Sequence, residues 1–142
     1  MRNITTITIA TERHHQLTAI SKSLNLSMGE IIARLVRTEI AAGTIPAELP
    51  GIKVERLADT VCITIDDNSA TTYTKADAAE LADAIERASS GQAINLLDLD
   101  SNFAVERRGN GVKVSVPLTG TARAFSRDVA ADLAQMVRAA AE

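Results

Sequence analysis

The chain opens with a regular alternation of polar and apolar residues. In "ITTITIAT", residues 4 to 11, Thr and Ile alternate, which is typical of a β-strand with one buried face. Residues 12–43 instead carry apolar residues at helical spacing, with a break near the middle. This pattern predicts a strand followed by two helices. A lone strand needs a partner for its backbone N–H and C=O groups.

Local signals predict where the two helices begin and end. The first is expected to span residues 12–24, since Asn25 can adopt the left-handed turn that ends a helix. Ser27 and Glu30 form a capping box at the start of the second helix. The following residues, 44–51, carry two Pro and one Gly and are predicted to be a linker.

The remainder of the chain, residues 52–142, contains an internal duplication. "VERLADTVCITI" (54–65) aligns with "VERRGNGVKVSV" (105–116) at an offset of 51 residues. "YTKADAAELADAIERA" (73–88) aligns with "FSRDVAADLAQMVRAA" (125–140) at an offset of 52. One residue is therefore inserted between the two aligned blocks of the second copy.

Each copy reads as strand, tight turn, strand, a short extended piece and helix, so the copies lie at about 52–90 and 103–141. One ββα or βββα unit is too thin to bury both faces of its elements. We therefore expect the two copies to share one core about a pseudo-twofold axis. With the strand and helices of residues 1–43, the fold class predicted is α+β.

The composition limits which residue types can form the core and which classes of ligand the chain can bind. Hydrophobic residues make up 46% of the chain but aromatic residues only 2%, so the core must be built from Ala, Ile, Leu and Val. Tyr73, Phe103 and Phe125 are too scattered to form a base-stacking platform. No apolar run approaches the roughly 20 residues that span a bilayer, and no signal peptide is present. Cys62 is alone, which excludes a disulfide framework.

The charge is unevenly distributed along the chain. Residues 1–44 hold five Lys and Arg against three acidic residues, a balance of +2. Residues 45–142 hold ten basic and fifteen acidic residues, a balance of −5. This asymmetry suggests that the N-terminal part meets a polyanion and the rest does not. The alternative is that +2 on a short segment has no functional meaning.

The segment "TITIATERHHQLTAISKSLNLSMGEIIARLVRTEI" resembles the ribbon-helix-helix family of DNA-binding proteins, the MetJ and Arc type. The resemblance covers residues 3–43 and rests on the alternating strand, the spacing of the apolar residues and the "LNLSMGEII" junction. It implies an obligate intertwined dimer, in which strands of two chains pair antiparallel and enter the major groove.

The resemblance also implies roles for individual residues. The residues expected to contact bases are Ile4, Thr6 and Thr8. Those expected to contact phosphates are Arg2, Asn3, Ser27, Met28 and Gly29, the last three through the N-terminus of the second helix. The dimer core is expected to contain Ile7, Ile9, Leu17, Ile20, Leu24, Ile31, Ile32, Leu35 and Val36. Many family members carry Arg, Lys, Asn or Gln on the ribbon, whereas Thr discriminates weakly between bases.

Motifs for catalysis or metal binding are not found. His14 and His15 are adjacent, and neighbouring helical side chains diverge by about 100°, which disfavours a shared metal. "DLDSN" begins like a calcium loop, but Phe103 and Gly109 stand where Gly and Glu are needed. No Walker A, dinucleotide or nucleophile-elbow motif appears. We therefore predict no enzyme activity, no catalytic residues, no metal and no cofactor.

Together these features predict a dimeric, sequence-specific DNA-binding protein, a transcriptional regulator (repressor) of bacterial, plasmid or phage origin. Its expected partners are double-stranded DNA, a second copy of the chain and higher oligomers, and its expected location is the cytoplasm, at the nucleoid. Residues 52–142 are expected to bind a protein partner or an effector, or to mediate assembly. The alternative is a protein–protein interaction module, antitoxin-like or a phage-encoded binder of a host factor, whose N-terminal part only dimerises.

Overall fold

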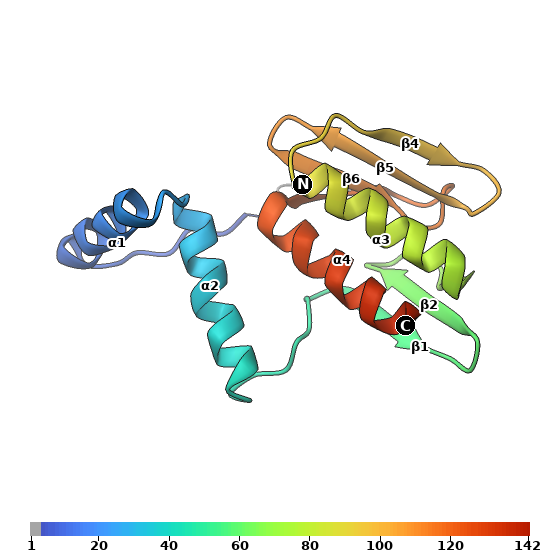
Figure 1. Cartoon of the computed structure of the whole chain (residues 1–142), viewed down its shortest axis with the longest axis horizontal. Helices are drawn as coiled ribbons and strands as arrows, with labels where there is room; N and C mark the ends of the chain where they lie inside the picture. The colour runs from blue at the N-terminus through green and yellow to red at the C-terminus, as the bar shows by residue number, and fades with distance from the viewer. Residues whose placement is uncertain (1–3) are drawn as a thin grey trace. The chain divides into compact units, whose positions relative to one another are not determined.

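The chain folds into two compact units, separated after Ala47. The computed structural model describes residues 4–142, so the predicted phosphate contacts Arg2 and Asn3 lie outside the described residues. Figure 1 shows helices in the N-terminal unit and both sheets and helices in the C-terminal unit. Within residues 4–142, no helix is both long and apolar enough to cross a membrane.

The N-terminal unit consists of two helices, α1 (Thr11–Leu24) and α2 (Met28–Ala41). Residues 4–10 form no strand, so the predicted ribbon-helix-helix fold is wrong: the helices are present but the ribbon is not. The alternation of Thr and Ile means only that these side chains would suit a strand with one buried face. It does not by itself make the backbone adopt the extended conformation. A strand also needs a ladder of hydrogen bonds, and no described strand pairs with this segment.

The ends of the two helices follow from local hydrogen bonding. Asn25 has φ 53° and ψ 46°, which confirms the left-handed residue predicted at the end of α1. The Ser27 hydroxyl accepts a hydrogen bond from the Glu30 N–H at 3.2 Å, which confirms the predicted cap of α2. The first turn of α1, by contrast, begins after Ala10 and has no side-chain cap.

The C-terminal unit contains two antiparallel sheets and two helices. In chain order, its elements are β1 (Ile52–Arg56), β2 (Thr60–Ile65), β3 (Thr71–Thr74), α3 (Lys75–Ser89), β4 (Asn95–Asp98), β5 (Phe103–Arg108), β6 (Gly111–Ser115), β7 (Arg123–Ser126) and α4 (Arg127–Ala141). The first sheet has the order β1-β2-β3 and the second the order β4-β5-β6-β7.

The two copies of the duplicated region contain matching elements. Adding 52 to the bounds of β3 and α3 gives the bounds of β7 and α4, and adding 51 to the first residues of β1 and β2 gives those of β5 and β6. These are the two offsets of the sequence alignment. β4 has no counterpart in the first copy, so the second sheet has one strand more than the first.

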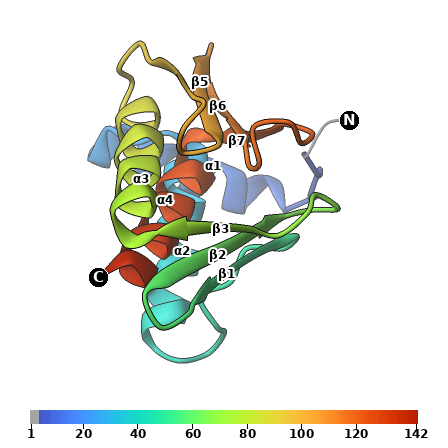
Figure 2. The ribbon, with the colours of Figure 1, turned by 90° about the vertical axis from the view of Figure 1, so that its right-hand side faces the viewer.

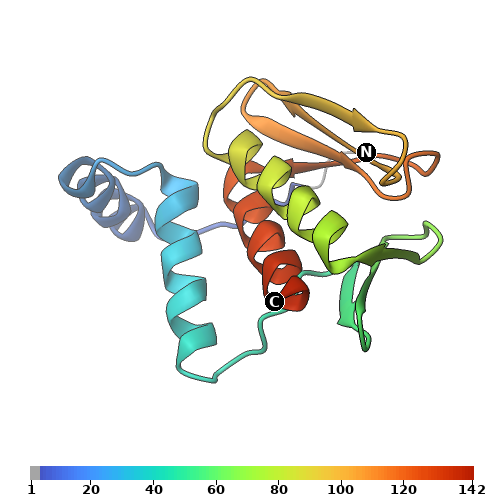
Figure 3. The same cartoon turned by 45° about the vertical axis from the view of Figure 1, so that its right-hand side comes forward.

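The helices pack across the two copies. α3, from the first copy, packs mainly on β5 and β6, whereas α4, from the second copy, packs mainly on β1 and β2. The helices themselves lie side by side (Figures 1 and 3), and Figure 2 shows the two sheets one above the other beside them. One cluster of buried residues joins both copies, and it includes Ile63, Leu81, Phe103 and Leu133. Each helix therefore completes the core of the other copy's sheet.

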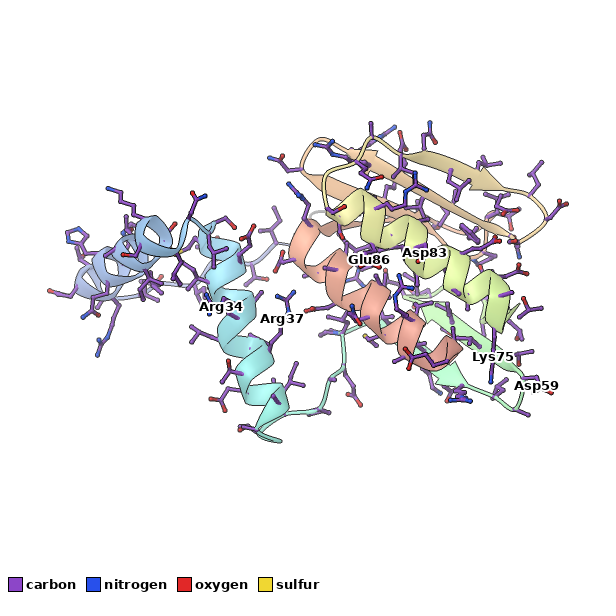
Figure 4. All side chains as sticks on the ribbon, in the orientation of Figure 1. Arg34, Arg37, Asp59, Lys75, Asp83 and Glu86 are labelled. Atoms are coloured by element: carbon purple, nitrogen blue, oxygen red, sulfur yellow. The ribbon has the colours of Figure 1, made fainter. Side chains whose placement is uncertain are left out.

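An ion-pair network joins α3 and α4 at equivalent positions of the two copies. Glu86 and Arg138 differ by the repeat offset of 52, as expected for residues that face each other near a pseudo-twofold axis. The Arg138 guanidinium donates to the Asp83 carboxylate at 2.8 Å and also to Glu86; Figure 4 labels the two acids. These hydrogen bonds, that to Asp83 first, raise the pKa of Arg138. The two carboxylates of this network are exposed, so each ion pair with Arg138 stabilises the fold by no more than about 1 kcal/mol.

Tyr73 links the two copies through a buried hydroxyl group. Its O–H donates to the C=O of Asn102 at 2.8 Å, and its ring meets that of Phe103 edge-on, with the centroids 6.2 Å apart. Burial, with a smaller effect of the Asp77 charge, raises the pKa of Tyr73 above its ordinary value of 10. The folded unit therefore holds this proton more tightly than the unfolded chain does.

We expect the stability of the C-terminal unit to fall as the pH rises above 10, because the unfolded chain then loses the Tyr73 proton first. Below pH 10 the contribution of this group should be fully present. Tyr73→Phe should cost about 1 kcal/mol at neutral pH, from the lost hydrogen bond, but lack this alkaline loss. Urea unfolding on both sides of pH 10, followed by circular dichroism, measures the difference. Equal alkaline losses in the two proteins would contradict this role of Tyr73.

Candidate nucleic-acid interface

Large aliphatic side chains of the N-terminal unit face solvent. Among its described residues, only Ile31 and Ala33 are buried. Nine others are between 41% and 76% exposed: Ile4, Ile7, Ile9, Ile20, Leu24, Ile32, Leu35, Val36 and Ile45. A unit of 47 residues is near the lower limit at which a single core can stabilise a fold, and this one has almost no core. Its apolar surface is therefore available for a partner.

The structure distributes the predicted dimer-core residues over three environments. Ile31 is buried within the chain, and Leu17 is half-buried. The remaining seven are exposed: Ile7, Ile9, Ile20, Leu24, Ile32, Leu35 and Val36. On α2, the residues at i, i+3 and i+4 form one face, which is made of Ile32, Leu35 and Val36. We call this face the α2 apolar stripe.

Basic residues lie on the other side of α2. At about 100° per residue, Arg34 and Arg37 project roughly opposite to the α2 apolar stripe. Both side chains are exposed, and Figure 4 labels them on this helix. The sequence pattern had assigned them no role, although their spacing of three within a positively charged segment was a signal that could have found them. α2 thus presents an apolar face and a basic face.

The predicted base contacts do not lie on a ribbon. Ile4, Thr6 and Thr8 are all exposed, but they belong to a segment without regular secondary structure. In a strand, alternate side chains point to the same face, and this alignment was the basis for assigning the three residues together. Without the strand, their common orientation no longer follows from the backbone.

The predicted phosphate contacts of the second helix lie at the N-terminus of α2. Ser27 is the N-cap, and Met28 and Gly29 are the first two helical residues, whose N–H groups have no partner within the helix. Ser27 and Gly29 are exposed. A Cβ atom added at Gly29 would meet only the Ser27 Oγ, at 4.0 Å, so space within the chain does not require glycine there.

Metal ligands do not converge in the described part of the chain. The ring centroids of His14 and His15 are 6.4 Å apart, and no group of three or more His, Cys, Asp or Glu in residues 4–142 is placed to hold a metal ion. The "DLDSN" segment lies in the hairpin between β4 and β5, where the Asp98 carboxylate accepts a hydrogen bond from the Ser101 N–H at 2.9 Å. This segment is therefore part of a turn between two strands.

An open depression of about 550 Å³ lies at one end of the second sheet. It is lined by Ala93, Ile94, Asn95, Glu106, Arg107 and Gly109. The Arg107 guanidinium donates to the Gly91 C=O, and its Nε atom is buried without a hydrogen-bond partner. One carboxylate and one guanidinium on an open surface do not form an acid–base or nucleophilic arrangement.

Comparison with known proteins gives no relative: no family model, no curated protein and no solved structure matches the chain.

Proposed function

We propose that this chain is a dimeric DNA-binding protein that regulates transcription. The observation that carries the proposal is the two-faced helix α2, with aliphatic side chains on one side and basic ones on the other, in a unit that has almost no core. The charge balance of +2 in residues 1–44 favours a polyanionic partner for this unit alone.

The partner of the apolar surface is a second copy of the chain. Seven exposed aliphatic side chains of the predicted dimer core need burial, and each contributes roughly 1.5–3 kcal/mol when it is fully buried. Two small units that share one core reach the size at which a fold becomes stable. Such a dimer has twofold symmetry, so its DNA site is expected to be palindromic.

DNA is held by the N-terminus of α2 and by the basic residues of the unit. Unpartnered N–H groups at Met28 and Gly29 and the positive end of the helix dipole suit a phosphate oxygen. Arg34 and Arg37 add sequence-independent attraction. The exposed hydroxyls of Thr6 and Thr8 are the candidates for contacts with bases.

A DNA titration at several salt concentrations tests the proposal. With roughly six phosphates neutralised per dimer, affinity should fall by about 10³-fold between 50 and 200 mM salt, because bound counterions are released. The fragment should come from upstream of the gene itself, with a scrambled fragment as competitor. Affinity that does not change with salt, or no binding to either fragment, would contradict the proposal.

A paired variant tests the base contacts within the same experiment. Thr6→Ala with Thr8→Ala should reduce the preference for the specific over the scrambled fragment while leaving the salt dependence unchanged. Thr64→Ala with Thr72→Ala is the matched control, since these threonines lie on the outer face of the first sheet. If both double variants retain the wild-type preference, Thr6 and Thr8 do not read bases.

The second candidate function is a protein–protein interaction module. Residues 4–10 carry no Lys, Arg, Asn or Gln, and the C-terminal unit has a balance of −5, which favours a protein partner over DNA for most of the chain. This function predicts a dimer that does not bind DNA at any salt concentration. The titration above therefore separates the two functions.

A further inference from the structure

The two sheets of the C-terminal unit differ at one edge. In the second sheet, β4 pairs antiparallel with β5 and covers its outer side. In the first sheet, the equivalent strand is β1, and among the described strands it pairs only with β2. The first copy therefore lacks, at this edge, the strand that the second copy has.

Burial of equivalent side chains shows the effect of the missing strand. Val105, on β5, is fully buried, and Leu96 of β4 packs beside it against the core. Val54 occupies the equivalent place on β1, 51 residues earlier, and is only half-buried. A strand added along β1 would cover Val54 as β4 covers Val105.

The backbone of β1 is arranged to accept such a strand. Asp66 donates its N–H to the Gly51 C=O, and Leu57 donates its N–H to the Thr60 C=O, so the odd-numbered residues of this segment point their backbone groups at β2. The even-numbered residues point outward, and of these the Ile52 N–H already donates to the Leu49 C=O. Arg107, equivalent to Arg56, uses its outward N–H to bind the Ile94 C=O beside β4.

We propose that β1 pairs antiparallel with β1 of a second copy, on a twofold axis at Val54. In this register, the N–H and C=O of Val54 pair with those of the second copy's Val54. The N–H of Arg56 meets the C=O of Ile52 in the second copy, and the N–H of the second copy's Arg56 meets the C=O of this Ile52. The Ile52 N–H is not part of this pairing, because it donates to the Leu49 C=O of its own chain at 3.1 Å. The two three-stranded sheets become one continuous sheet of six strands, and both Val54 side chains gain cover.

Charge complementarity identifies the occupant as a second copy. Lys53 and Glu55 project from the outer face of β1 and form an exposed ion pair at 3.1 Å. Charges on an edge strand normally discourage pairing. On a twofold axis at Val54, however, Lys53 lies directly opposite Glu55 of the second copy, and Glu55 opposite its Lys53. Each of these cross-strand pairs is attractive.

This surface is formed by other residues than those of the proposed N-terminal dimer, and the contact does not depend on DNA binding. A five-residue strand buries little area, so the contact is weak by itself. Together with an N-terminal dimer it gives each chain two twofold interfaces, which allows dimers to assemble side by side. Once one of the two interfaces has formed, the chains are held near each other, and this high effective local concentration strengthens the β1 contact.

Sedimentation equilibrium of the full chain tests the proposal, in a Leu35→Glu background that removes N-terminal association. The background protein should self-associate at high concentration. Lys53→Glu and Glu55→Lys should each weaken this association by about tenfold or more, because both cross-strand pairs become repulsive. Arg108→Glu is the matched control: it also places like charges two residues apart, at Glu106 and position 108, but on β5, which β4 covers.

Mixing the two charge variants is the decisive measurement. The Lys53→Glu chain carries two negative charges and the Glu55→Lys chain two positive ones, so a 1:1 mixture should associate at least as tightly as the background protein. A mixture that associates no better than its components, or a background protein that stays monomeric, would overturn the proposal. The N-terminal dimer is tested separately, by comparing the masses of the wild type and the Leu35→Glu protein. If these masses are equal, the N-terminal dimer does not form, whatever the result for β1.

Discussion

Replacing Leu35 with Glu is expected to separate the N-terminal dimer into monomers at concentrations too low for the weak β1 contact to form. Leu35 lies in the centre of the α2 apolar stripe and is 59% exposed in the single chain. Across a twofold axis the substitution acts twice, and each lost Leu removes at least about 1.5 kcal/mol, so the dimer should weaken by at least ~100-fold. Sedimentation equilibrium measures the change. DNA affinity should fall with it, because one protomer holds half of the phosphate contacts.

The matched control for this variant is Leu97→Glu. Leu97, on the outer face of the second sheet, is also 59% exposed, so the two substitutions place the same charge on equally accessible positions. Leu97→Glu should leave both the mass and the DNA affinity at the wild-type values. Circular dichroism should show a loss of helix content in Leu35→Glu but not in Leu97→Glu, because a separated N-terminal unit has almost no core of its own. A Leu35→Glu protein that dimerises as the wild type does would rule out the α2 apolar stripe as the interface.

Replacing Phe103 with Ala should destabilise the C-terminal unit by about 3–5 kcal/mol. Phe103 has no exposed surface and begins β5, where it meets Tyr73 of the first copy edge-on. Its loss opens a cavity in the only core of this unit, and the total stability of a domain is about 5–15 kcal/mol. The variant should therefore be partly unfolded or close to it.

Urea unfolding followed by Tyr fluorescence measures this effect in the full chain. Tyr73 is the single tyrosine and there is no Trp, so the signal reports the C-terminal unit alone. Leu99→Ala is the control, because Leu99 is 75% exposed and its removal should change stability by less than about 0.5 kcal/mol. If Phe103→Ala unfolds at the wild-type midpoint, the two copies do not depend on one shared core.

Part of the candidate site followed from local sequence and part did not. The cap at Ser27 and the left-handed Asn25 were predictable because both depend on residues within one turn. The strand at residues 4–10 was predicted wrongly, because alternation describes side chains, whereas a strand exists only where another strand supplies hydrogen bonds. The basic face of α2 was not predicted, because the ribbon-helix-helix resemblance assigns the base contacts to the ribbon.

β4 also escaped prediction, for a different reason. The alignment of the two copies shows only what they share, and β4 belongs to the second copy alone. Its short sequence, "NLLD", contains two leucines and no regular alternation. The unequal sheets, and with them the uncovered edge of β1, are visible only when the strands are assembled.

The sequence by itself determined the two helices before the linker, the N-terminal cap of α2, the duplication and its offsets, because these depend on periodicity and on contacts a few residues apart. Only the tertiary structure decided that α3 packs on the second sheet and α4 on the first, that residues 4–10 form no strand, and that β1 has an uncovered edge. The physical reason is that strand pairing and helix packing join residues that are distant in sequence. Several partners of similar hydrophobicity are then available, and only their shapes in three dimensions distinguish them.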